Sequence, residues 1–238
     1  MKRGALLPKL VLALLLVSMS VGVSETVVPL FDADFEADAV GGMPSASPAG
    51  DPPDDQLEVQ GTAEVVSSAA LGSKALKIAR RPTVAAVKCV AAPGPHESGL
   101  YDIRFKLYAT VDESPLEVTV RSRYDGAALF LGYANGNYTL ASGDGQETIS
   151  GMYPKGTVHS IHIRLNMDTR KFMLRINEAT VASDKAFFED LFQDVHLLRV
   201  NYVLSTVAPM PDKPGECVVD DIMIQKYIPS DGPDCGLF

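Results

Sequence analysis

The sequence has no tryptophan and little cysteine or histidine. Its 238 residues include four His and three Cys, namely Cys89, Cys217 and Cys235. A monomer with three cysteines forms at most one disulfide and keeps one free thiol, and the sequence leaves the pairing open. No Cys-x-x-Cys spacing occurs and no Cys neighbours a His. Thiol catalysis and a structural zinc site therefore find little support.

Positive charge is scarce as well. The chain carries 21 Lys and Arg against 30 Asp and Glu, a formal net charge of −9. Unspecific nucleic-acid binding needs clustered cations that displace phosphate counterions, so this class of function is disfavoured. The excess acid lies at the two ends of the chain: residues 25–73 hold ten acids and no Lys or Arg, and residues 210–238 hold six acids against two Lys.

The chain is 46% hydrophobic, which excludes a disordered or collagen-like polymer.

The N-terminus has the order of a signal peptide. Lys2, Arg3 and Lys9 precede an apolar run at Leu10–Val17, and small residues follow as far as Ser24. This run is well short of the roughly 20 residues of a membrane-spanning helix. We therefore expect residues 1–24 to be removed on export, which gives a secreted or periplasmic protein without a stable membrane span. Residues 25–238 have a length at which all-β sandwiches form a single domain.

Period-two alternation runs through the rest of the chain. Between Tyr101 and Ala109, apolar side chains at odd positions alternate with Asp102, Arg104 and Lys106, which predicts a half-buried strand. Polar turns separate this run from similar ones. The other predicted strands cover residues 57–67, 75–80, 84–91, 116–121, 128–133, 161–165, 171–176, 196–204 and 217–226.

One segment has helical rather than strand periodicity. In Lys185–Asp194, Phe188 and Phe192 are four residues apart, which predicts a short crossover helix. Many short strands with polar turns favour two packed antiparallel sheets. The predicted fold class is an all-β, two-sheet antiparallel β-sandwich, a jelly roll, with this one short helix.

Three segments resemble the concanavalin A-like lectin/glucanase group, which includes the laminin-G-like jelly rolls. They are Phe31–Glu36 with the following Gly41–Pro44, the hairpin-like Val158–Asn177, and the closing Cys217–Ile224. The resemblance implies a jelly roll whose first and last strands lie close together. Retaining glucanases of this group carry a Glu-x-Asp-x-x-Glu strand, and no such string occurs in this sequence.

The acidic ends of the chain suggest a cation site. Jelly rolls of the resembled group often hold one calcium near these strands, and carboxylate oxygens are suitable ligands for it. We therefore hypothesise a structural Ca²⁺ bound by some of Asp34, Glu36, Asp220 and Asp221. Asp220 lies two residues before Ile222 on the same predicted strand, so both side chains are expected to face the core. A carboxylate in the core needs a partner. Alternatively, these acids are solvated or cap backbone amides at strand ends.

A series of basic residues falls mostly on outward strand faces. If several share one sheet, they form a groove for an anionic glycan, because Arg pairs with carboxylate or sulfate through two parallel hydrogen bonds. Alternatively, they solubilise the sheet and balance acids on neighbouring strands. The series consists of Arg104, Lys106, Arg121, Arg123, Arg164, Arg175 and Arg199.

Tyrosines and one histidine complete the candidate ligand-binding residues. Tyr124, Tyr133 and Tyr138 lie in a glycine-rich stretch together with Tyr153, where their rings could stack on sugars or pack hairpins. His162 lies on the polar face beside Arg164 and is a candidate base, whereas His159 lies on the apolar face and is expected at the edge of the core.

These observations predict a secreted module that binds carbohydrate or a cell-surface component and has no identifiable catalytic residues. The first alternative is a carbohydrate-active enzyme, a glycoside hydrolase or polysaccharide lyase, that uses His162, Arg121 and Tyr124. The second alternative is a structural protein of the envelope or matrix. A glycan, including an anionic one, is the predicted partner, and one structural Ca²⁺ is the only predicted cofactor.

Overall fold

The computed structural model describes residues 25–44, 57–60, 62–79, 86–90, 96–109, 116–122, 126–134, 136–190, 192–195, 197–202 and 216–229. The predicted signal peptide, residues 1–24, lies outside these ranges, as do Arg123 and Tyr124 of the predicted site and Cys235.

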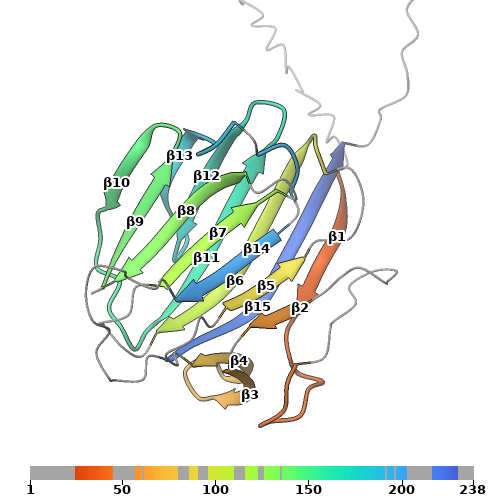
Figure 1. Ribbon diagram of the computed structural model, residues 1–238, viewed down its shortest axis with the longest axis vertical. Coiled ribbons are helices and arrows are strands. Elements are labelled where there is room, and N and C mark those ends of the chain that lie inside the picture. Colours follow the sequence, from red (N-terminus) through yellow and green to blue (C-terminus); the bar gives the residue numbers. More distant parts are fainter. Residues whose placement is uncertain are drawn as a thin grey trace, which may run out of the picture.

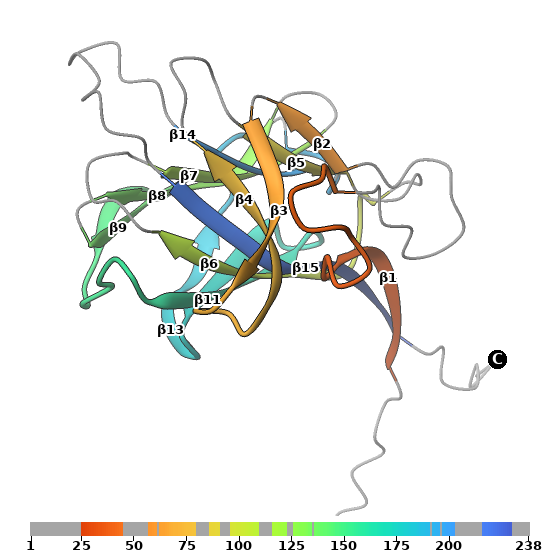
Figure 2. The ribbon, with the colours of Figure 1, turned by 90° about the horizontal axis from the view of Figure 1, so that it is seen from below.

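The described residues form two sheets in which every pair of neighbouring strands is antiparallel (Figures 1 and 2). The eight-stranded sheet has the order β13 (Ala179–Ala186), β12 (Lys171–Ile176), β11 (Val158–Asn166), β6 (Leu100–Ala109), β15 (Glu216–Pro229), β4 (Ser73–Ala79) and β3 (Thr62–Ser68), and β1 (Glu25–Ala33) also pairs with β15. The seven-stranded sheet has the order β10 (Gly145–Ile149), β9 (Asn137–Ser142), β8 (Ala127–Ala134), β7 (Leu116–Arg121), β14 (Leu197–Tyr202), β5 (Ala86–Val90) and β2 (Leu57–Gln60). The predicted two-sheet antiparallel sandwich is confirmed.

The core lies between the two sheets and is built from the inward residues of each strand. On β6, Ile103 and Leu107 are fully buried, while Arg104 between them is exposed. Leu129 and Leu131 of β8, on the other sheet, belong to the same buried cluster. The alternation of the sequence therefore corresponds to one face in the core and one face in solvent.

The first and last strands are neighbours, as the resemblance implied. β1 runs antiparallel to β15, with Asp32 opposite Met223 and Ala33 opposite Ile222 (Figure 2). The pairing of β15 with β6 contains a β-bulge between Asp220 and Met223, and Asp221 has a positive φ of 49°. This bulge shifts the side-chain alternation along β15.

The predicted helix at Lys185–Asp194 is wrong. Lys185 and Ala186 end β13, and the described residues that follow form turns and bends. The amide of Phe188 donates to the Ala128 carbonyl and the amide of Glu189 donates to the Ala127 carbonyl. Because these donors bond across to β8, they are not available for a helix. In the part of the chain that the structure describes, no helix could cross a membrane.

Candidate functional site

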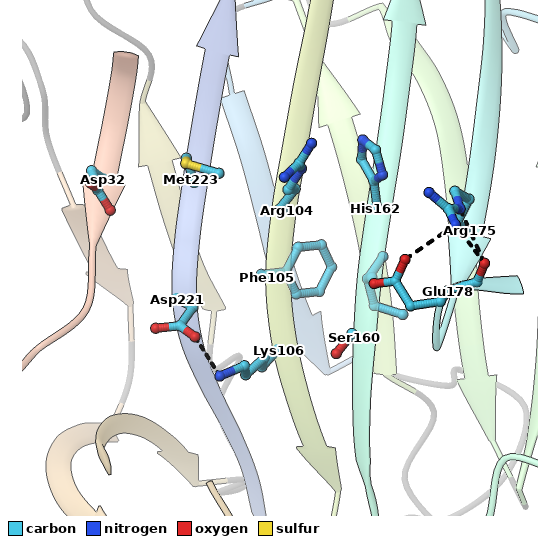
Figure 3. A pocket seen from close by; sticks show the side chains of 11 residues that line it. Asp32, Arg104, Phe105, Lys106, Ser160, His162, Arg175, Glu178, Asp221 and Met223 are labelled. Atoms are coloured by element: carbon cyan, nitrogen blue, oxygen red, sulfur yellow. Dashed lines mark hydrogen bonds and ion pairs between the residues drawn. The ribbon is translucent and has the colours of Figure 1, made fainter. Parts of the chain in front are cut away.

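A groove of about 470 Å³ crosses the outward face of the eight-stranded sheet (Figure 3). Because side chains alternate along each strand, the polar residues of β6 and β11 point outward into it, while Phe105 and Ile161 contribute from between them. The groove is lined by Asp32, Arg104, Phe105, Lys106, Ser160, Ile161, His162, Arg175, Glu178, Asp221 and Met223.

The centre of the groove is one row of residues in register across five strands. Asp32 of β1 is opposite Met223 of β15, which is opposite Arg104 of β6. Arg104 is in turn opposite His162 of β11, which is opposite Arg175 of β12. Strands lie about 4.8 Å apart, so the three basic side chains stand side by side along the groove. Figure 3 shows Arg104 and His162 extending from neighbouring strands in the same direction.

A buried carboxylate holds the central residues of this row. Asp102 is fully buried, although it lies on the outward side of β6. Its Oδ2 accepts hydrogen bonds from Arg104 at 2.9 Å and from the Tyr227 hydroxyl at 2.9 Å. Arg164 donates to both carboxylate oxygens, at 2.7 Å to Oδ1 and 2.9 Å to Oδ2. His162 Nε2 lies 3.1 Å from Oδ1, within ion-pair distance but outside hydrogen-bond geometry.

The charge of Asp102 is compensated by these neighbours. Burial raises the pKa of Asp102, but His162, Arg164 and Tyr227 lower it by more, so that its pKa lies well below the usual range of a carboxyl group. Asp102 is therefore ionised, and its hydrogen bond with Arg104 holds the guanidinium in position.

Both ends of the groove carry acids that pair with its cations. Lys106 Nζ lies 2.5 Å from the Asp221 carboxylate. Arg175 lies 3.1 Å from the Glu178 carboxylate and also donates two hydrogen bonds to the Glu178 carbonyl. The groove thus combines carboxylate acceptors at its ends with Arg104 and His162 at its centre.

The structure divides the predicted basic series between the two sheets. Arg104, Lys106, Arg164 and Arg175 lie on the outward face of the eight-stranded sheet together with His162. Arg121 and Arg199 belong to β7 and β14 of the seven-stranded sheet. Several members of the series thus share one sheet, and the groove uses residues of this subset.

Tyr133 and Tyr138 do not form an exposed platform for a sugar. They are opposite each other on β8 and β9 and are 2% and 0% exposed. The Tyr138 hydroxyl lies 2.9 Å from His159 Nδ1, and the Tyr133 hydroxyl donates to the Tyr153 carbonyl at 2.8 Å. These tyrosines pack the core with His159, which is buried as its place on the apolar face indicated.

Three of the predicted calcium ligands already have partners from the protein. The Glu36 carboxylate accepts the Lys74 amide, and the Asp34 carboxylate accepts the Glu36 amide. Asp221 pairs with Lys106. Among the described residues, no group of three or more His, Cys, Asp or Glu is arranged to hold a metal ion.

Asp220 lies on the side of β15 opposite to the one expected. The bulge places it across from Lys106, on the outward side of the sheet, rather than on the core side with Ile222. It is nevertheless fully buried, and its Oδ2 accepts a hydrogen bond of 2.5 Å from the Ser73 hydroxyl. Its Oδ1 has no hydrogen-bond partner.

The sequence matches no protein-family model and no curated protein, but solved structures share its fold. The catalytic domain of a glycoside hydrolase family 131 protein from Coprinopsis cinerea is 14% identical, with a TM-score of 0.52 over 86% of this chain and 95% of that chain. A sialidase is 16% identical, with a TM-score of 0.53 over 71% of this chain.

A third similar structure is that of botulinum neurotoxin type C, whose cell entry depends on interaction with two ganglioside molecules. It is 11% identical, with a TM-score of 0.53 over 83% of this chain. This chain spans only 17% of the length of the sialidase and 47% of the toxin chain. With its two antiparallel sheets and its adjacent first and last strands, the chain has the concanavalin A-like jelly-roll fold.

Proposed function

We propose that the protein is a glycan-binding module whose ligand lies in the groove of the eight-stranded sheet. The observation that carries this proposal is the row of Arg104, His162 and Arg175 beside the buried carboxylate of Asp102. Proteins of similar fold include a glycoside hydrolase, a sialidase and a toxin that interacts with gangliosides, which supports a carbohydrate as the class of ligand.

The groove favours a glycan that bears an acidic group. Within the described residues, Arg104 gives one hydrogen bond to Asp102 and keeps its other N–H groups for a ligand. A guanidinium held in this way can bind a carboxylate or sulfate through two parallel hydrogen bonds. The carboxylates of Glu178 and Asp221 at the ends of the groove can accept hydrogen bonds from sugar hydroxyls. An exported protein, as residues 1–24 predict, meets such glycans at cell surfaces and in the extracellular matrix.

The test is binding of oligosaccharides of uronic acids and of sulfated sugars, measured by calorimetry beside their uncharged counterparts. Arg104→Ala is expected to weaken binding of the acidic glycans at least tenfold. Lys171→Ala is the matched control, because it removes a cation from the outward side of the same sheet, on β12, outside the groove. Equal affinity of the Arg104→Ala variant and the unchanged protein for every acidic glycan would reject the proposal.

A catalytic role at the same groove is the second candidate. His162 is 17% exposed, lines the groove and lies 3.1 Å from the ionised Asp102, and a histidine in a binding groove is a candidate for proton transfer. Release of reducing ends or of unsaturated products from a bound glycan would reveal an enzyme, and His162→Asn should then abolish this release even at glycan concentrations that saturate binding. Binding without any release would leave the protein a binding module.

A further inference from the structure

A second cavity, of about 420 Å³, lies on the outward face of the seven-stranded sheet. It is on the side of the sandwich opposite to the groove, because the inward residues of β8, such as Leu129 and Leu131, fill the core between the sheets. The cavity is lined by Glu117, Phe130, Gly132, Thr139, Ala141, Gly145, Gln146 and Phe188.

Two phenylalanines form an aromatic corner at this cavity. The ring centres of Phe130 and Phe188 are 4.8 Å apart and the ring planes are 77° apart, so the rings present two nearly perpendicular apolar walls. Phe188 is 40% exposed. Its ring therefore offers an apolar face to a ligand in the cavity.

The segment that carries the exposed Phe188 ring is fastened to β8. The Phe188 amide donates to the Ala128 carbonyl at 2.7 Å, and the Glu189 amide donates to the Ala127 carbonyl at 3.0 Å. In return, the Ala127 amide donates to the Glu189 carboxylate at 2.8 Å. Two backbone hydrogen bonds and one to the Glu189 side chain thus fasten Phe188 and Glu189 to β8, and a segment held in this way loses little conformational entropy when a ligand binds.

The surface beside the corner is kept open by a glycine. Gly132 is opposite Thr139 on the neighbouring strand, and a Cβ atom at this position would lie only 2.7 Å from the Thr139 hydroxyl. Any side chain there would displace Thr139. Next to it, Ala141 is opposite Phe130. Small residues therefore leave room for a flat ring against Phe130.

The polar groups around the corner suit an uncharged sugar. Glu117, Thr139 and Gln146 can exchange hydrogen bonds with hydroxyl groups, while the lining contains one carboxylate and no Lys or Arg to neutralise an anion. Thr119, opposite Phe130 on β7, is 1% exposed, and its hydroxyl has no hydrogen-bond partner. Thr119 does not line the cavity, so the hydrogen bonds to a bound sugar come from Glu117, Thr139 and Gln146.

The geometry points to a second saccharide site, at which a neutral pyranose ring stacks in the corner of Phe130 and Phe188. One face of such a ring presents C–H groups that pack against an aromatic ring, and its rim presents hydroxyls to Glu117 and Gln146. This site lies on the other sheet from the groove, has no Lys or Arg among the described residues that line it, and is expected to bind an uncharged sugar rather than an acidic glycan. It stands independently of the function proposed for the groove.

The experiment titrates the full chain with cellohexaose, mannohexaose and xylohexaose by calorimetry. Phe188→Ala is expected to weaken binding of the preferred hexaose at least tenfold, whereas Phe188→Tyr, which keeps the ring, should stay within threefold. Ile228→Ala is the matched control, because Ile228 is an apolar side chain of similar exposure, 44%, on the other sheet. It should leave the affinity unchanged.

Gln146→Ala tests whether weaker binding of the Phe188→Ala variant comes from the site rather than from a loss of folding. Gln146 is an exposed residue of the edge strand β10, and its substitution is expected to weaken binding about threefold. The inference is overturned if no hexaose binds the unchanged protein, or if Phe188→Ala and Gln146→Ala bind as tightly as it does. Arg104→Ala separates the two sites, because it should leave hexaose affinity unchanged whatever happens to acidic glycans at the groove.

Discussion

Arg164 donates two hydrogen bonds to Asp102, from Nε to Oδ1 at 2.7 Å and from a terminal nitrogen to Oδ2 at 2.9 Å. The two residues are 62 positions apart in the sequence and face each other on neighbouring strands. This paired contact ties β11 to β6 on the outward side of the sheet, next to the row of Arg104 and His162. Because Arg104 also bonds to the same carboxylate, the stability of the sheet and the shape of the groove depend on one side chain.

Asp102→Asn should therefore destabilise the protein. The neutral amide cannot compensate Arg164 and Arg104, and breaking a buried ion pair in this way costs about 3 kcal/mol, the lower end of the usual range, because both arginines stay partly solvated. The measurement is the free energy of unfolding in urea. Asp184→Asn is the control, since Asp184 is 83% exposed with Lys171 at 3.7 Å, and it should change stability by about 0.5 kcal/mol or less. Equal stability of the Asp102→Asn and Asp184→Asn variants would contradict the role assigned to Asp102.

The sandwich was predictable because strand alternation is a local property of the sequence. The apolar residues at odd positions from Tyr101 to Leu107 lie in the core as predicted, and Arg104 between them is exposed. The helix prediction failed for a reason that is not local. Phe187 and Phe192 both reach the core with their ring centres 4.9 Å apart, and the amides of Phe188 and Glu189 bond to β8. A spacing of aromatic residues does not reveal a hydrogen bond to a distant strand.

The site was only partly predictable from the sequence. Arg104, His162 and Arg164 were identified because strand alternation places their side chains on the outward face, and they lie on that face in the structure. Asp102 was not, because its burial depends on Arg164 and Tyr227, 62 and 125 positions away. The bulge at Asp221 left no signal in the sequence either, so that the side of Asp220 was assigned wrongly.

Asp220→Asn should stabilise the protein at neutral pH. Burial raises the pKa of Asp220 above its ordinary value of 3.8, although the Ser73 hydrogen bond opposes this. The fold therefore favours the protonated form of Asp220. Asp220 contributes its full stability below pH 3.8, and this contribution is lost as the pH rises through the pKa that Asp220 has in the folded protein. Removing the unpartnered anionic oxygen should add about 1 kcal/mol at pH 7, and this gain should vanish near pH 3, as followed by urea unfolding at both pH values.

Asp221→Asn is the control for that measurement. It breaks an exposed ion pair with Lys106, which should change stability by less than about 1 kcal/mol at either pH. Loss of stability in Asp220→Asn at pH 7 would mean that the carboxylate is needed ionised, as for a cation ligand, and would contradict the prediction.

Removal of divalent cations tests the calcium hypothesis directly. The protein groups that engage Glu36 and Asp221, the Lys74 amide and the Lys106 ammonium, would have to give way to an ion. We therefore expect the midpoint of thermal unfolding to stay the same, within about 1 °C, after treatment with EDTA. A lower midpoint that calcium, but not magnesium, restores would establish the site and show that these contacts rearrange.

His159 should make the stability of the protein depend on pH in a different window. Burial lowers the pKa of His159, and its hydrogen bond with the Pro154 carbonyl only partly opposes this. Because the folded state then binds a proton less readily than the unfolded chain, His159 contributes its full stability above about pH 6.5, and this contribution is lost as pH falls below that value. The thermal midpoint should therefore drop between pH 7 and pH 5. In His159→Gln, which cannot be protonated, the protein should be less stable at pH 7 but its midpoint should drop less over the same range. An equal drop in both proteins would show that another group controls this dependence.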